Sequence, residues 1–69
     1  MNVQSQLVTK RIREMRETKN YTQTFVADKL KISQNAYSKV ELGITTISLE
    51  RILMIAEVLE IDILKLIGV

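Results

Sequence analysis

Apolar residues recur along this chain at intervals of three and four positions, the spacing that gathers them on one side of an α-helix. In the first such stretch, residues 3–18, the apolar stripe consists of Leu7, Val8, Ile12 and Met15. The sequence has no proline and two glycines, and β-branched residues nowhere alternate with polar ones for long. Because alternation of that kind marks strands, the sequence predicts an all-α fold.

Further helices are predicted from a start signal that occurs four times. In each case a polar residue that can cap a helix follows an apolar residue, which can pack against another at the fourth helical position. The predicted caps are Thr22, Ser33, Ser48 and Asp62. Gly43 can take a positive φ and so end the third helix, which is predicted over residues 34–42. We therefore expect a single domain of five helices over residues 1–69.

The second and third predicted helices are separated only by Lys31 and Ile32 before the cap at Ser33. So tight a turn makes two short helices cross steeply and presents one of them to a partner, which is helix-turn-helix geometry.

The third predicted helix divides into an apolar and a polar side. At about 100° per residue, Ala36, Tyr37 and Val40 are predicted to point toward the core. The other side carries Gln34, Asn35, Ser38 and Lys39. All four side chains can donate hydrogen bonds and none is negatively charged, which suits the acceptor-rich major groove of DNA. The alternative is an ordinary solvated helix face.

Charge is unevenly distributed, although the net charge is only +2. Residues 1–40 carry eight Lys/Arg and three Asp/Glu, whereas residues 41–69 carry two Lys/Arg and five Asp/Glu. This favours a polyanionic partner for the N-terminal part, although chance imbalance on a solvated surface would look the same. Gln23, the first residue of the predicted second helix, stands where the helix dipole favours a phosphate; it would also suit an exposed helix position.

The composition argues against several classes of function. Without histidine or cysteine we expect no metal site and no cofactor. A glycine-rich phosphate loop and paired carboxylates are also missing, so we expect neither an enzyme nor a small-molecule substrate. No apolar run approaches the roughly 18 residues of a membrane span, so we expect a cytoplasmic protein.

From Arg11 to about Ile67 the sequence resembles the phage-repressor and Cro-type (XRE-like) helix-turn-helix family. The resemblance rests on the joint spacing of YTQ at 21–23, ADKL at 27–30, ISQ at 32–34, YSKVELG at 37–43 and SLERILMIAEVL at 48–59. It implies a compact five-helix domain of the lambda-repressor type that binds double-stranded DNA. The implied function is transcription regulation, by a repressor or autoregulator that reads a palindromic operator through the major groove.

The resemblance also implies roles for individual residues. Gln34, Asn35 and Lys39 match positions that read base edges, and Ser38 matches an exposed position beside them. Gln23 matches a glutamine that binds backbone phosphate. Arg16 and Glu41 match an internal ion pair, whose net contribution would be near zero because desolvation offsets attraction.

Three departures from the family pattern affect these roles. Lys31 stands where a glycine or asparagine is usual, so the turn either strains Lys31 or adopts different dihedrals. Leu42 stands where relatives often have Asn or Arg; it either meets a thymine methyl, covers the sugar-phosphate edge or is merely exposed. The loop 44–46 has no Lys or Arg. Phosphate contacts are therefore expected from backbone amides and from Thr22, Arg11, Thr45 and Thr46.

The predicted fourth helix has two apolar stripes, whereas the core of a small domain needs one. The surplus predicts a homodimer interface, with Ile55, Val58, Ile63 and Ile67 as candidates. The alternative is a fourth helix buried on several sides by its neighbours. A competing hypothesis keeps the fold but makes the protein an interaction module, such as an antitoxin that folds against a toxin.

Overall fold

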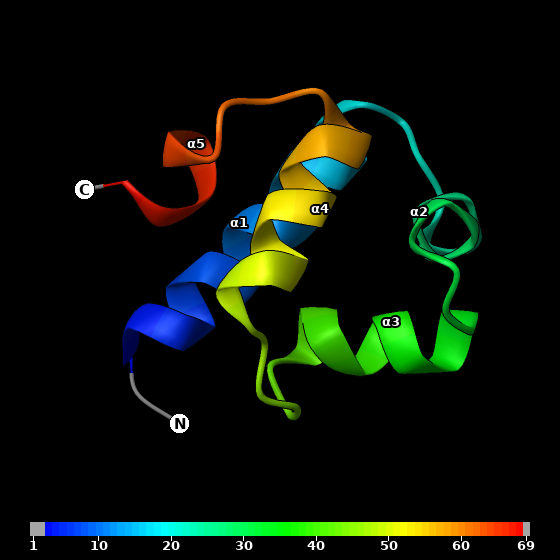
Figure 1. Ribbon diagram of the computed structural model, residues 1–69, viewed down its shortest axis with the longest axis horizontal. Coiled ribbons are helices and arrows are strands. Elements are labelled where there is room, and N and C mark those ends of the chain that lie inside the picture. Colours follow the sequence, from blue (N-terminus) through cyan, green and yellow to red (C-terminus); the bar gives the residue numbers. More distant parts are fainter. Residues whose placement is uncertain (1–2, 69) are drawn as a thin grey trace.

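The computed structural model describes residues 3–68 and contains five helices in that range. They are α1 (Val3–Thr18), α2 (Gln23–Leu30), α3 (Gln34–Leu42), α4 (Leu49–Leu59) and α5 (Leu64–Ile67). Figure 1 shows α4 crossing in front of α1, with α3 along the lower edge and with α2 and α5 on opposite sides. The predicted all-α helix-turn-helix fold is confirmed. Between residues 3 and 68, no helix has the length and apolarity needed to cross a membrane.

Three of the four predicted caps begin a helix as expected. The hydroxyls of Thr22, Ser33 and Ser48 each accept a hydrogen bond from the backbone N–H three residues later, at 3.0–3.1 Å. The expectation at Asp62 was wrong by one residue, because α5 begins at Leu64 with Ile63 in the cap position. The Asp62 carboxylate instead accepts from the N–H of Leu64 at 3.0 Å and so closes the turn that leads into this short helix.

Left-handed residues end three of the helices. Gly43 ends α3 with φ 73°, as predicted, whereas α2 and α4 end at Lys31 and Glu60, with φ 62° and 57°. Of the two alternatives for the α2–α3 turn, the structure therefore has the strained one. Lys31 accepts an unfavourable conformation because its N–H and that of Ile32 then bond to the last carbonyls of α2.

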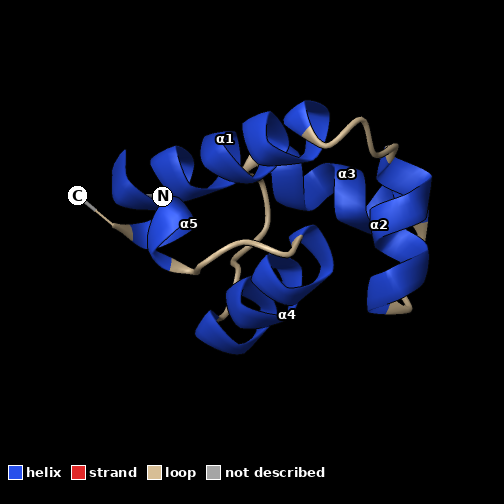
Figure 2. Cartoon of the chain, turned by 90° about the horizontal axis from the view of Figure 1, so that it is seen from above, coloured by secondary structure: helices blue, strands red, loops and turns tan. Residues whose placement is uncertain are grey.

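The core lies between α1, α4 and the helix-turn-helix pair. Figure 2 shows from above how these helices are arranged. Its largest fully buried side chains include Ile12, Tyr37, Ile55, Leu59 and Leu66. Two sequence expectations are corrected here. Ala36 is exposed rather than in the core, because the buried side of α3 is centred on Tyr37, Val40 and Glu41. Ile55 is completely buried within one chain, so it is not part of a surface that a second copy could cover.

The last helix is fastened to the first by Arg11. Its Nη1 donates to the carbonyls of Leu66 at 3.1 Å and Gly68 at 2.5 Å, across 55 and 57 residues of chain. Position 68 has little room for a side chain, since a Cβ there would lie 2.4 Å from the carbonyl oxygen of Leu64. Arg11 therefore holds the C-terminal segment against α1.

Candidate nucleic-acid interface

The polar side of α3 faces outward from the edge of the molecule. Gln34, Asn35 and Lys39 are exposed and Ser38 is half-buried, while Tyr37 and Val40 point into the core. The only acidic residue of the helix is Glu41, which is turned inward and 9% exposed. The exposed surface of α3 consequently offers amide, hydroxyl and ammonium donors without a carboxylate.

Glu41 is held by an arginine from the first helix. Arg16 donates from Nε to Oε2 of Glu41 at 2.6 Å and from Nη2 to Oε1 at 3.1 Å. A third donor, Nη1, reaches the carbonyl of Tyr21 at 2.8 Å, in the connection between α1 and α2. The two side chains are 11% and 3% exposed. This ion pair therefore joins three segments of the chain behind the outward face of α3.

Burial and pairing shift the ionisation of this cluster. Burial by itself raises the pKa of Glu41, but its hydrogen bonds, chiefly from Arg16, outweigh burial and leave that pKa below its ordinary value. The hydrogen bond to Glu41 raises the pKa of Arg16. Burial, reinforced by the Glu41 carboxylate, raises the pKa of Tyr37, whose hydroxyl has no hydrogen-bond partner among the described residues. The pair is thus fully charged and Tyr37 neutral near neutral pH.

The ion pair continues to the protein surface through two glutamines. Gln23 donates from Nε2 to Oε1 of Glu41 at 3.1 Å, and Gln34 donates from Nε2 to Oε1 of Gln23 at 2.8 Å. Both bonds fix which way each amide points, because each glutamine donates inward. The residue predicted to bind phosphate and one predicted to read bases are therefore parts of one network, which spacing along the sequence does not reveal.

A groove of about 550 Å³ lies on the other flank of α3, between this helix, the α3–α4 loop and the start of α4. Its apolar lining comes from Ile32, Ala36, Val40 and Ile47. The predicted contacts Asn35, Lys39, Thr45 and Thr46 all border it. The structure therefore gathers two predicted base contacts and two predicted phosphate contacts around one concave surface.

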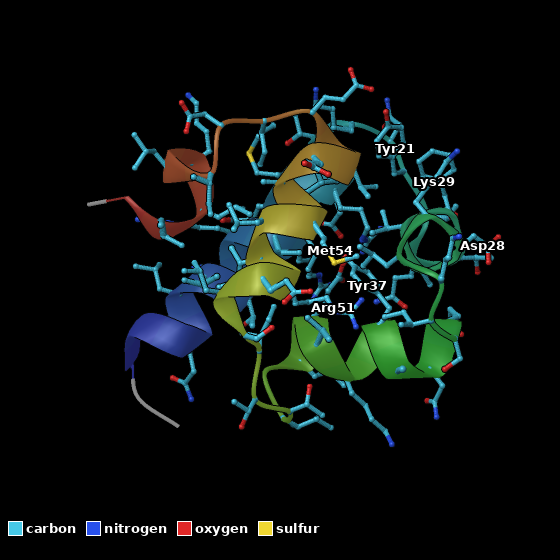
Figure 3. All side chains as sticks on the ribbon, in the orientation of Figure 1. Tyr21, Asp28, Lys29, Tyr37, Arg51 and Met54 are labelled. Atoms are coloured by element: carbon cyan, nitrogen blue, oxygen red, sulfur yellow. The ribbon has the colours of Figure 1, made fainter. Side chains whose placement is uncertain are left out.

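The sequence analysis did not identify one charged residue of this groove, Arg51. Figure 3 shows Arg51 between α4 and α3, and its Nη1 is buried without a hydrogen-bond partner among the described residues. The prediction for the fourth helix considered only its apolar stripes and not Arg51, the single cationic residue of this helix. The available signal was position, because a side chain in the first turn leans back toward the preceding loop.

The remaining predicted contacts stay predictions. The hydroxyl of Thr22 accepts from the N–H of Phe25 at the start of α2 and keeps its own proton for a phosphate. Leu42 is 65% exposed on α3, which agrees with each of its three predicted roles. Nη1 of Arg11 donates to two backbone carbonyls, so a phosphate would have to bind the other N–H groups of this side chain.

The candidates for a dimer interface are distributed differently from the prediction. Besides the buried Ile55, Val58 and Ile63 are half-buried against the core, and only Ile67 is exposed, at 40%. More apolar surface belongs to residues that were not named, since Leu49, Leu53 and Leu64 are 47–64% exposed. The surplus apolar surface thus exists on α4 and α5, but apart from Ile67 it belongs to side chains other than the predicted ones.

Comparison with known families and proteins gives one match. A family model described as helix-turn-helix matches residues 12–66, which is more than half of the chain. The match runs from the middle of α1 into α5 and includes every residue of the network and of the groove described above. Neither the curated proteins nor the solved structures contain a significant match.

Proposed function

The chain belongs to the XRE-like helix-turn-helix family of DNA-binding transcription regulators, and from this premise we propose that it is a dimeric repressor that reads a palindromic operator. In this proposal α3 enters the major groove. Gln34, Asn35 and Lys39 contact base edges, with Ser38 beside them. The repressor acts by occupying the promoter. If the operator lies in the promoter of its own gene, the protein regulates its own expression.

The outward face of α3 is the observation that carries this proposal. Its only carboxylate, Glu41, is turned inward and paired with Arg16, so nothing on this face repels phosphate. Glutamine and asparagine amides pair with N6 and N7 of adenine, and lysine donates to O6 and N7 of guanine. Each such contact discriminates against a wrong base, whereas a merely solvated face has no reason to lack acids.

The glutamine network supports the same assignment. Gln34 uses one amide proton on Gln23, so its carbonyl oxygen and second proton remain for a base. Gln23 lies at the start of α2, where backbone N–H groups favour a phosphate. Contact with the DNA backbone by Gln23 would then set the orientation in which Gln34 meets the base.

Dimerisation is proposed because a single helix reads too few base pairs for a specific site. Two copies related by a two-fold axis would present their α3 helices to half-sites about 34 Å apart. The surface proposed for this contact consists of Leu49 and Leu53 on α4 with Leu64 and Ile67 on α5, all 40–64% exposed. A second copy of the same surface would remove this apolar area from water.

Selection of bound duplexes from a random pool tests the specific function. We expect the wild-type protein to enrich one palindromic sequence at moderate salt. Gln34→Ala and Lys39→Ala should each lose about 1–3 kcal/mol of discrimination at one base pair per half-site. Lys65→Ala, an exposed lysine on α5, removes a charge elsewhere and should leave the selected sequence unchanged. Failure of the wild type to enrich any sequence would refute specific recognition.

Analytical ultracentrifugation tests the dimer. Leu53→Glu places a charge in the proposed contact and should produce a monomer at micromolar concentration, where the wild type sediments as a dimer. Met54→Glu is the matched control, because Met54 is also partly exposed but lies about 100° further around α4. A monomeric wild type, or equal effects of the two variants, would contradict the proposed surface.

A further inference from the structure

The groove beside α3 has the chemistry of an anion site. Two cationic side chains, Lys39 and Arg51, line it together with the polar residues Asn35, Thr45 and Thr46. No acidic residue is among its lining residues. Its concave shape keeps a bound group close to several donors at once, which a flat surface with the same residues would not do.

Arg51 supplies the second, independent observation. A guanidinium has five N–H donors and no acceptor, so it needs acceptors around it. Nη1 of Arg51 is shielded from solvent and has no hydrogen-bond partner among residues 3–68. Burying a charged donor without an acceptor is unfavourable. An anion in the groove would provide the missing acceptor, and phosphate matches the fork geometry of arginine especially well.

The position of the groove indicates where that phosphate comes from. The major groove is bordered by two sugar-phosphate backbones, and α3 has a polar region on each flank. Gln23 at the start of α2 lies on one flank, and the loop with Thr45 and Thr46 lies on the other. Residues 44–46 contain no lysine or arginine. Arg51, three residues after the Ser48 cap, places a cation against this loop.

We propose that Arg51 binds a backbone phosphate of the DNA on the α3–α4 flank of the recognition helix, with the hydroxyls of Thr45 and Thr46 as further donors. This inference rests on the proposed function and adds a second phosphate contact to the one proposed for Gln23. The contact positions the protein on the duplex and carries no sequence information.

The test measures how DNA affinity depends on salt concentration, by fluorescence anisotropy between about 50 and 200 mM NaCl. Over this range the logarithm of the affinity falls roughly linearly with the logarithm of the salt concentration. Arg51→Gln should reduce the slope of log affinity against log salt by about 0.9, which is about an 8-fold loss of affinity near 0.1 M salt. The loss should be equal for the selected operator and for unrelated duplex DNA. Arg51→Lys keeps the charge and should keep the slope.

Lys65→Gln is the control for loss of a positive charge outside the groove, and it should leave the slope close to that of the wild type. Thermal unfolding of each variant shows whether the fold persists. An NMR titration of the wild type does not depend on any variant: the Nε–H resonance of Arg51 should shift until one duplex is bound per protein dimer. Inorganic phosphate alone should shift it only weakly.

Several results would overturn the proposal. One is an Arg51→Gln slope equal to that of the wild type while the operator is still selected, and another is an equal loss in Lys65→Gln. A large shift with inorganic phosphate but none with DNA would assign the groove to a free anion. If the wild type selects no sequence and binds no duplex, the proposed function fails and this inference fails with it.

Discussion

Replacing Arg16 by methionine removes the guanidinium that neutralises Glu41 and keeps an unbranched apolar stem. The Glu41 side chain, which is 3% exposed, would retain only the hydrogen bond from Gln23. Breaking a buried pair from one side in this way costs about 3–5 kcal/mol. A domain of 69 residues has about 3–10 kcal/mol of stability in total. Arg16→Met should therefore lose about a third or more of the stability of the domain.

The structure also predicts an order among the variants. Glu41→Gln should cost less, about 2 kcal/mol, because Arg16 is 11% exposed and still has the carbonyl of Tyr21 as an acceptor. The double variant leaves no buried charge without its counterion, so it should be more stable than Arg16→Met alone. The coupling energy between the two sites is expected to be on the order of 2 kcal/mol.

Urea unfolding followed by helical circular dichroism at pH 7 measures all three variants, at one protein concentration because a dimer links stability to concentration. The surface pair Arg13–Glu17 is the internal control, since its 3.5 Å contact joins side chains 60% and 54% exposed. Arg13→Met should cost about 0.5 kcal/mol or less. Additive effects of the Arg16 and Glu41 substitutions, with a coupling below about 0.5 kcal/mol, would refute the reasoning.

Three further outcomes are expected. Lys31→Gly should raise the free energy of unfolding by about 1 kcal/mol, since glycine adopts the left-handed φ of 62° without strain; a loss in urea unfolding would contradict this. Ser48→Ala removes the cap of α4 and should cost about 1 kcal/mol in the same assay, whereas an unchanged midpoint would show the cap to be unimportant. Because folding lowers the pKa of Glu41 below its ordinary 4.5, its contribution is complete above that pH and is lost as pH falls through the folded pKa. Thermal midpoints should thus drop less steeply below pH 4.5 in Glu41→Gln than in the wild type, and parallel curves would refute the linkage.

Local signals in the sequence were sufficient for most of the fold. The bounds of α2 and α3 agree with the prediction because caps at Thr22 and Ser33 act on N–H groups three residues away. The positive φ of Gly43 is equally local. Asp62 shows the limit of this reasoning. Its carboxylate accepts from a backbone N–H as expected, but that N–H belongs to Leu64, two residues later, and Ile63 lies in the turn before the helix. The helix therefore begins one residue later than predicted.

The periodicity of apolar residues predicted the apolar stripes. It did not determine which residues of each stripe face the core. Ile55 and Leu53 both belong to apolar stripes of α4, yet one is fully buried and the other is 47% exposed. The rotation of α4 is decided by how α1 and α2 pack against it, and those helices come from distant parts of the chain. Ala36, at the edge of the buried side of α3, was assigned wrongly for the same reason.

The sequence by itself determined the helices, the turn between α2 and α3, and a helix surface that carries donors and no exposed acid. Only the tertiary structure decided that Gln34, Gln23, Glu41 and Arg16 form one network, and that Arg51 lines the groove beside α3. Helix signals act within one or two turns of chain. Contacts across 18 or 25 residues exist only once the helices pack, because packing brings those side chains within hydrogen-bond distance.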